Sequence, residues 1–121
     1  MKGIEEKIGY SFKNRELLET ALTHSSYSRE AAEGQEHNER MAYLGDAMLD
    51  AIIGAKLYRL FPGKEEGFLT RTRASLVCEK SLAAAGRRIN INEYLRLGRG
   101  EEKIGGRNRD SIIADAVEAV I

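Results

Sequence analysis

The chain has 121 residues, of which 42% are hydrophobic, and it contains three Phe and no Trp. This length fits a single domain spanning 1–121 with a modest aliphatic core, and it argues against several domains. Nineteen basic and nineteen acidic residues give no formal net charge, which excludes binding of polyanions through overall positive charge. The lone Cys78 cannot form an intramolecular disulfide, and charges interrupt every apolar run before membrane-spanning length. We therefore expect a cytoplasmic protein without a membrane partner.

The N-terminal third predicts one short helix and one loop. Residues 16–22 carry an apolar stripe at helical spacing, and Asn14 is a suitable residue to cap a helix there. We expect this helix to end near His24. Residues 28–37 are polar and lack an apolar period, so they predict a loop that is the least ordered part of the chain.

The middle of the chain predicts two longer helices. Between residues 38 and 60 apolar side chains recur every three or four positions, which indicates one long helix that ends before Pro62. Because apolar residues cover most of its circumference, we expect it to be the buried central helix. A further helix is predicted after Pro62 and through about Cys78.

The C-terminal third predicts helices separated by a glycine-containing loop. A helix is expected over about 80–88, a loop over 98–107, and a last helix from about Ile112, capped by Asp110 and Ser111. No segment shows the two-residue period of a β-strand. The sequence therefore predicts an all-α fold in one domain.

Two of the predicted helices place acidic residues among apolar ones. Asp46 lies in the long helix, where we expect it to be at least half buried, and Asp115 and Glu118 share one face of the last helix. A buried carboxylate is costly unless it is paired or binds a cation, and carboxylate oxygens are the ligands that Mg²⁺ prefers. The pattern suggests a metal site for phosphodiester hydrolysis. The alternative is that Asp46 pairs with Arg40 or Lys56 and that Asp115 is an ordinary acid in a first helical turn.

Several sequence motifs follow one another in a specific order. Residues 38–46 read Asn-Glu-Arg-Met-Ala-Tyr-Leu-Gly-Asp, and residues 111–119 read Ser-Ile-Ile-Ala-Asp-Ala-Val-Glu-Ala. Together with segments 8–12, 21–27 and 97–101, they resemble the endonuclease domain of the ribonuclease III family, in which Asn-Glu-Arg-Leu-Glu-Phe-Leu-Gly-Asp is typical. The resemblance covers almost the whole chain and implies the all-helical fold of that family.

The resemblance implies a role for each of the acids. Asp46 and Glu118 match the catalytic acids of the family, and Asp46, Asp115 and Glu118 match metal ligands. The remaining ligand in the family is a glutamate four residues before the aspartate, and here that position holds Ala42, which has no oxygen to offer. We interpret Ala42 as an engineered inactivating substitution, with natural divergence toward a non-cleaving relative as the alternative.

Further positions are candidates for supporting roles outside the set of metal ligands. The resemblance implies secondary acids at Glu39 and Glu66 and a dimer contact at Tyr43, for which core packing is the alternative. Basic residues outnumber acidic ones between 87 and 109, and such local charge is suited to phosphates. The candidates for RNA contact are Arg99, Arg107 and Arg109, and a solvated charged loop is the alternative.

The resemblance implies an endoribonuclease that cleaves double-stranded RNA as a homodimer and acts in rRNA and mRNA processing. Its cofactor would be Mg²⁺, with Mn²⁺ as a substitute. Family members continue into further helices and a double-stranded-RNA-binding domain, and we expect both to be absent from this sequence. The alternative function is a non-catalytic module of the same fold that binds RNA or a ribosome, for which Ala42 is the main support.

Overall fold

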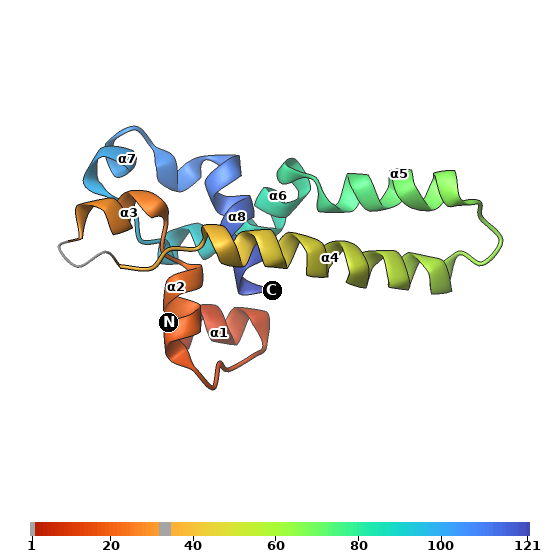
Figure 1. Cartoon of the computed structure of the whole chain (residues 1–121), viewed down its shortest axis with the longest axis horizontal. Helices are drawn as coiled ribbons and strands as arrows, with labels where there is room; N and C mark the ends of the chain where they lie inside the picture. The colour runs from red at the N-terminus through yellow and green to blue at the C-terminus, as the bar shows by residue number, and fades with distance from the viewer. Residues whose placement is uncertain (1, 32–34) are drawn as a thin grey trace.

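Helix α4 (Glu39–Leu60) runs along most of the length of the molecule in the computed structural model, which describes residues 2–31 and 35–121 (Figure 1). Its first half crosses the helical body, and its second half projects from the body beside α5 (Glu66–Val77) as a two-helix arm. Helix α4 ends just before Pro62, which has no backbone N–H to continue the helical hydrogen bonds. The two long helices predicted for the middle of the chain are confirmed.

The rest of the chain forms short helices around the first half of α4. They are α1 (Lys2–Ile8), α2 (Arg15–Ala21), α3 (Ser25–Glu30), α6 (Glu79–Arg88), α7 (Arg99–Lys103), α8 (Asp110–Val120) and the 3₁₀-helices η1 (Ile91–Tyr94) and η2 (Gly106–Asn108). Within residues 2–31 and 35–121 there is no β-strand, and Thr23 and Arg96 form an isolated bridge. The predicted all-α fold is confirmed. In the same residues no helix is long and apolar enough to cross a membrane.

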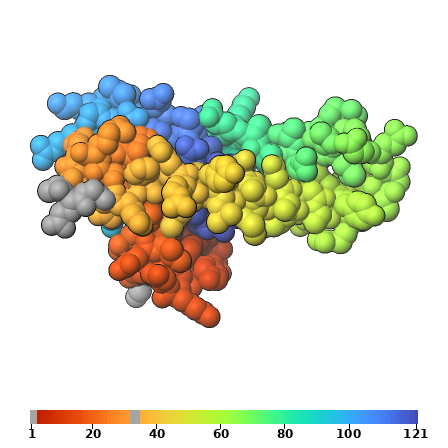
Figure 2. Space-filling model, in the orientation of Figure 1, coloured from red at the N-terminus to blue at the C-terminus, as the bar shows by residue number. Residues whose placement is uncertain are grey.

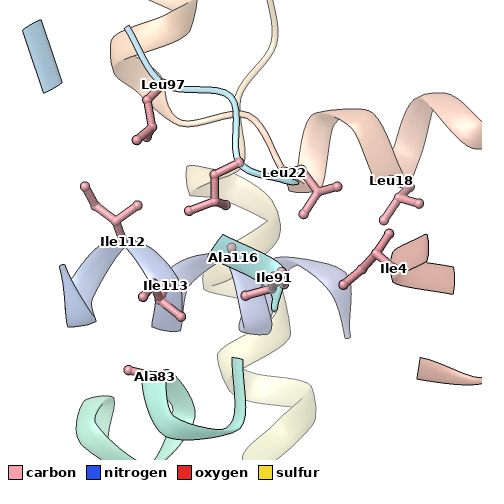
Figure 3. Close-up of a cluster of buried hydrophobic side chains, with 10 residues drawn as sticks. Ile4, Leu18, Leu22, Ala83, Ile91, Leu97, Ile112, Ile113 and Ala116 are labelled. Carbon is pink, nitrogen blue, oxygen red and sulfur yellow. The ribbon is translucent and has the colours of Figure 1, made fainter. Parts of the chain in front are cut away.

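Helix α8 lies at the centre of the body and packs against α4 and α6 (Figure 1). The core around it consists of aliphatic side chains of α1, α2, α6, η1, α8 itself and residues that connect helices (Figure 3): Ile4, Leu18, Leu22, Ala83, Ile91, Leu95, Leu97, Ile112, Ile113 and Ala116. Full burial of one such Ile or Leu side chain contributes about 1.5–3 kcal/mol to folding. This core fixes the position of α8 in the body, and α8 also packs directly on α4, which determines where its acids lie.

The short helices correct several predicted boundaries. Helix α2 and its cap are confirmed, since the Asn14 side chain accepts a hydrogen bond from the Glu16 N–H at 3.0 Å. The loop predicted from residue 28 is wrong up to residue 30, because His24 caps a further helix, α3, by accepting a hydrogen bond from the Ser26 N–H. The part of that predicted loop at residues 32–34 lies outside the described residues.

Two more helices and one helix start differ from the predictions. Helix α1 was not predicted, and α7 occupies part of the segment 98–107 that was predicted to be a loop. Helix α8 begins at Asp110 instead of about Ile112, so Asp110 is its first residue and not its cap. The first turn of α8 starts earlier because the Ile113 N–H donates to the Arg109 carbonyl.

The expectation that α4 is buried on most sides is wrong for one face. Leu44, Ile52 and Tyr58 are 62%, 51% and 71% exposed, whereas the buried residues of the helix are Ala42, Gly45 and Leu57. The physical reason is that α8 covers one side of α4 near its start and α5 covers one side near its end. The remaining side of α4 lies uncovered across the visible face of the molecule (Figure 2).

Candidate functional site

The backbones of helices α4 and α8 come very close together where Gly45 of α4 contacts Glu118 of α8. A Cβ atom added at Gly45 would overlap the Glu118 carbonyl oxygen, so only a residue without a side chain allows this approach. Gly45 is buried, and Asp46 follows it directly. The crossing therefore places Asp46 beside Glu118, although the two residues come from opposite halves of the sequence.

The carboxyl groups of Asp46 and Glu118 interact at this crossing. The pKa of Glu118 is raised to about 7, first by burial and then by a hydrogen bond to Asp46. The negative charges of Asp46, Asp115 and Asp50 also favour the protonated form of Glu118. A carboxyl group whose pKa is raised by burial and by several neighbouring acids lies where negative charge is concentrated, and a cation binds favourably at such a place.

Asp115 belongs to the same cluster of acids. Burial raises the pKa of Asp115, the charges of Glu79 and Glu39 raise it further, and His24 has the opposite effect. The structure thus brings Glu39 to the cluster together with Asp46, Asp115 and Glu118. The secondary acid Glu39 and the three expected metal ligands occupy one region of the molecule.

Asp46 itself is exposed, so the expectation that it is at least half buried is wrong. The neighbours expected to bury it, such as Leu44 and Met48, lie on the uncovered side of α4 and are exposed as well. Within the described residues Asp46 makes no ion pair with Arg40 or Lys56. The alternative in which those side chains neutralise Asp46 has no support in the structure.

Ala42 lies one helical turn before Asp46 and is 7% exposed. Residues four apart share a helix face, so position 42 is directed to the same region as Asp46. In residues 2–31 and 35–121 no three Asp, Glu, His or Cys side chains are arranged to hold a metal ion. The oxygens at the crossing have the chemistry that a hard divalent cation requires, but the set is incomplete, and Ala42 adds only a methyl group to it.

Glu66 is far from this cluster within one chain. It is the first residue of α5 at the far end of the arm, where its side chain accepts a hydrogen bond from Thr70 at 3.2 Å (Figure 1). The end of α4 nearest to Glu66 lies about 20 Å from Asp46 along the helix axis, since each residue adds about 1.5 Å. A single copy of the chain does not bring Glu66 to the acids at the crossing.

The three arginines expected to contact RNA have different surroundings. Arg107 donates to the backbone carbonyls of Asn92 and Leu95 at 2.8 and 2.9 Å and forms an ion pair with Glu102. These contacts are internal and hold η2 against η1 and the residue that follows it. Arg109 lies 3.5 Å from Glu101 in a partly exposed ion pair. In the described ranges Arg99, which is exposed at the start of α7, takes part in no ion pair.

Tyr43 is 82% exposed, so the alternative in which it packs in the core is wrong. It borders an open groove of about 900 Å³ that His37, Arg40 and Met41 also line. The groove lies beside the exposed stripe of α4 and contains no residue of the acid cluster except Glu39. Tyr43 is therefore available for contact with another molecule.

Sequence reasoning missed two acids that act on the cluster. Asp50 lies one helical turn after Asp46, so the same four-residue spacing that singles out position 42 also indicates Asp50. Glu79 starts α6 and influences Asp115 from a third helix. No sequence pattern links Glu79 to Asp115, because their proximity depends on how α6 packs against α8.

The sequence matches a family model described as ribonuclease-III-like over residues 14–121. The chain is similar to Ribonuclease 3 of Vibrio cholerae, with 50% identity over 121 residues that cover 100% of this chain and 51% of the relative. It is also similar to Ribonuclease 3 of Caldanaerobacter subterraneus, with 48% identity over 98% of this chain and 52% of the relative. The chain therefore spans about half the length of the curated relatives that it matches.

The fold is similar to solved structures of a nuclease domain. A structure of the nuclease domain of ribonuclease III from Campylobacter jejuni superimposes with a TM-score of 0.91 at 38% identity, covering 98% of this chain and 80% of that one. A second structure of the same domain gives a TM-score of 0.90, also at 38% identity, and covers 99% of this chain and 78% of that one. The first of these is described by flexibility in its region involved in dimer formation. The family model, the relatives and the fold agree, and the chain belongs to the ribonuclease III family.

Proposed function

We propose that this chain is the nuclease domain of an endoribonuclease that cleaves double-stranded RNA with the help of Mg²⁺, for which Mn²⁺ can substitute. The observation that carries the proposal is the meeting of Asp46 with Glu118 at the α4–α8 crossing, with Asp115 close by. Hard divalent cations prefer such carboxylate oxygens. Enzymes of the family are in general dependent on divalent metal ions, which agrees with this use of the acids.

In this proposal Asp46, Asp115 and Glu118 hold the cation and orient it toward a scissile phosphate. A bound Mg²⁺ supplies a reactive water at neutral pH and stabilises negative charge on the phosphoryl oxygens. Glu39, in the first turn of α4, adds negative charge at the edge of the cluster. Ala42 removes one ligand from the set, so we expect the present chain to bind the cation weakly and to cleave slowly.

The RNA would approach the acids from the side of α7 and the start of α8. Arg99 and Arg109 are the better candidates for phosphate contacts, because Arg107 is engaged with backbone carbonyls of its own chain. We place the substrates among the double-stranded regions of rRNA and mRNA precursors in the cytoplasm, as the family membership suggests. The absence of a formal net charge agrees with an affinity that depends on a few local cations.

We further propose that two copies of the chain associate through the exposed side of α4 around Tyr43. A contiguous apolar surface of this kind is typical of an interaction site. The related nuclease domain of Campylobacter jejuni, which is described as having a region involved in dimer formation, supports the association of two copies. The expected molar mass in solution is therefore twice the 13.5 kDa of one chain.

The test of the proposed activity is to restore the missing ligand. We expect Ala42→Glu to cleave double-stranded RNA in Mg²⁺ at least about 100-fold faster than the unchanged chain, since loss of even an outer partner that orients a metal ligand costs about 10- to 100-fold. The rate is measured on an end-labelled duplex with and without Mg²⁺. Ala42→Gln is the matched control, because it has the size of glutamate without its charge and is expected to remain slow. Adding Asp46→Asn to Ala42→Glu should abolish the gain.

The same experiment distinguishes the proposed nuclease from the second candidate function, a non-catalytic module of the same fold that binds RNA or a ribosome. Ala42 itself favours a non-catalytic module, since it is the one expected ligand position without an oxygen. If Ala42→Glu binds the duplex but cuts it in neither Mg²⁺ nor Mn²⁺, the chain is such a module and Ala42 is not an inactivating substitution.

A further inference from the structure

Asn38 precedes α4 at a position where an asparagine usually caps a helix by accepting a backbone hydrogen bond. Its side chain makes no such bond here, although the residue is only 3% exposed. Instead, its side-chain N–H donates to the carbonyl of Ala21, the last residue of α2, at 3.0 Å. The amide therefore connects two elements that are distant in the sequence.

The backbone of Asn38 strengthens this connection. Its N–H donates to the Thr23 carbonyl at 2.9 Å, and its own carbonyl accepts a hydrogen bond from the Ala42 N–H at 2.8 Å. Three hydrogen bonds thus link residues 21–26, which we call the α2–α3 corner, through Asn38 to the turn of α4 that contains Ala42. Thr23 within this corner is fully buried, so water does not compete with the Asn38 N–H for the Thr23 carbonyl.

The same corner also holds the segment that leads into α7 and α8. The Arg96 N–H donates to the Leu22 carbonyl at 2.8 Å, and the His24 N–H donates to the Arg96 carbonyl at 3.0 Å. Two residues later, the Gly98 N–H donates to the Ser26 hydroxyl at 2.9 Å. The corner is therefore hydrogen-bonded both to Asn38 at the start of α4 and to the segment before α7, which precedes α8 in the chain.

His24 and Ser26 make the corner rigid. The Ser26 hydroxyl accepts from Gly98, so its own proton is free to point to the His24 Nδ1, which lies 2.8 Å away and also accepts the Ser26 N–H. Both bonds require an unprotonated Nδ1. Burial lowers the pKa of His24, which keeps the ring neutral and the two bonds intact.

We propose that Asn38 is a positioning residue for the acid cluster. By fixing the start of α4 to the α2–α3 corner, it sets how α4 lies on α8, and so how closely Asp46 approaches Glu118. The chemical role of that approach rests on the proposed metal site. The effect of Asn38 on the position of α4 does not depend on metal binding and can be tested separately.

An aspartate at position 38 distinguishes a tether from a cap. Aspartate has the same shape and is an equally good helix cap, but it cannot donate a hydrogen bond to the Ala21 carbonyl. If Asn38 acted as an ordinary cap, Asn38→Asp would be harmless. If it acts as a tether, the carboxylate faces a carbonyl oxygen and the start of α4 moves away from the corner.

The experiment compares Asn38→Asp with Leu57→Ala, both introduced into the Ala42→Glu protein. Leu57 is a buried residue near the far end of α4, so its truncation weakens folding without touching the corner. Asn38→Ala, which removes the amide without adding charge, serves if the aspartate prevents folding. Mn²⁺ affinity is measured by water-proton relaxation, and backbone amide signals are compared by nitrogen-15 NMR at a temperature where every variant is folded.

We expect the Asn38 variants to bind Mn²⁺ at least tenfold more weakly than the Ala42→Glu parent and Leu57→Ala to stay within twofold of it. The amide signals of Asp46 and Glu118 should move in the Asn38 variants. Unchanged Mn²⁺ affinity, with signal changes confined to residues near 38, would overturn the proposal. If the parent itself binds no Mn²⁺, the metal site is wrong, and movement or constancy of the Asp46 and Glu118 signals still supports or refutes the tether.

Discussion

The position that brings the acids together is the one without a side chain. Gly45 lies inside a helix of 22 residues, where glycine costs about 1 kcal/mol relative to alanine. The structure gives the compensating reason, because any Cβ there would overlap the carbonyl of Glu118. The neighbouring Asp46 reaches Glu118 because the two backbones are in contact.

We expect Gly45→Ala to lower the free energy of unfolding by about 3 kcal/mol, since an inserted methyl must push two helix backbones apart. Urea denaturation followed by circular dichroism measures the change. Gly100→Ala is the control, because Gly100 is exposed in α7 and an added Cβ there meets nothing within 4 Å. Equal stability of the two variants would contradict the close crossing.

At this scale the sequence predicts which acids matter better than it predicts what surrounds them. Asp115, Glu118 and Asp46 were indicated by their spacing and by family resemblance, and the structure gathers them at one crossing. The exposure of Asp46 was not predictable, because it depends on which side of α4 the other helices leave open. Arg107 illustrates the same limit, since its positive charge says nothing about the two carbonyls that it binds.

Among the elements, the longer helices are easier to recognise in the sequence, although the seven-residue α2 is also predicted because Asn14 is a suitable cap for it. Helices α4, α5 and α6 contain between 10 and 22 residues, enough for an apolar period to be recognised. Helices α1, α3 and α7 contain between 5 and 7 residues, which is too few for isolated stability. They form because of tertiary contacts such as the fully buried Ile4 and the bond between Gly98 and Ser26, which no local pattern displays.

The pairing of α4 with α8 was likewise beyond local patterns. Each helix carries acids at readable spacing, but the contribution of Glu79 from α6 arises only when three helices pack together. The metal site stays a prediction, although the structure brings its expected residues from α4 and α8 into one region and adds Glu79 and Asp50 to their surroundings. Helix periodicity predicts which acids share a face of one helix. The packing that brings the two helices together depends on the α2–α3 corner and on the contact at Gly45.

For the whole molecule, the uncovered side of α4 is the feature that a single chain leaves unexplained. We expect Tyr43→Asp to shift the chain from dimer to monomer, because a charge replaces an aromatic ring at the proposed contact. Sedimentation equilibrium over a range of concentrations measures the mass against the 13.5 kDa of one chain.

Tyr10→Asp is the matched control for that measurement. Tyr10 is also an exposed tyrosine, but it lies between α1 and α2 and packs on Phe12 at a ring distance of 5.0 Å. It should leave the mass unchanged. If Tyr43→Asp and the unchanged chain have the same mass at every concentration, the exposed side of α4 is not the dimer contact.

The central claim is that Asp46, Asp115 and Glu118 form a divalent-cation site that lacks one ligand at position 42. Anomalous scattering from crystals of Ala42→Glu soaked in Mn²⁺ tests it most directly. We predict one strong peak at the α4–α8 crossing, with oxygens of Asp46 and Glu118 within about 2.5 Å of the ion. Strong Mn²⁺ peaks elsewhere, with none at the crossing, would contradict the claim.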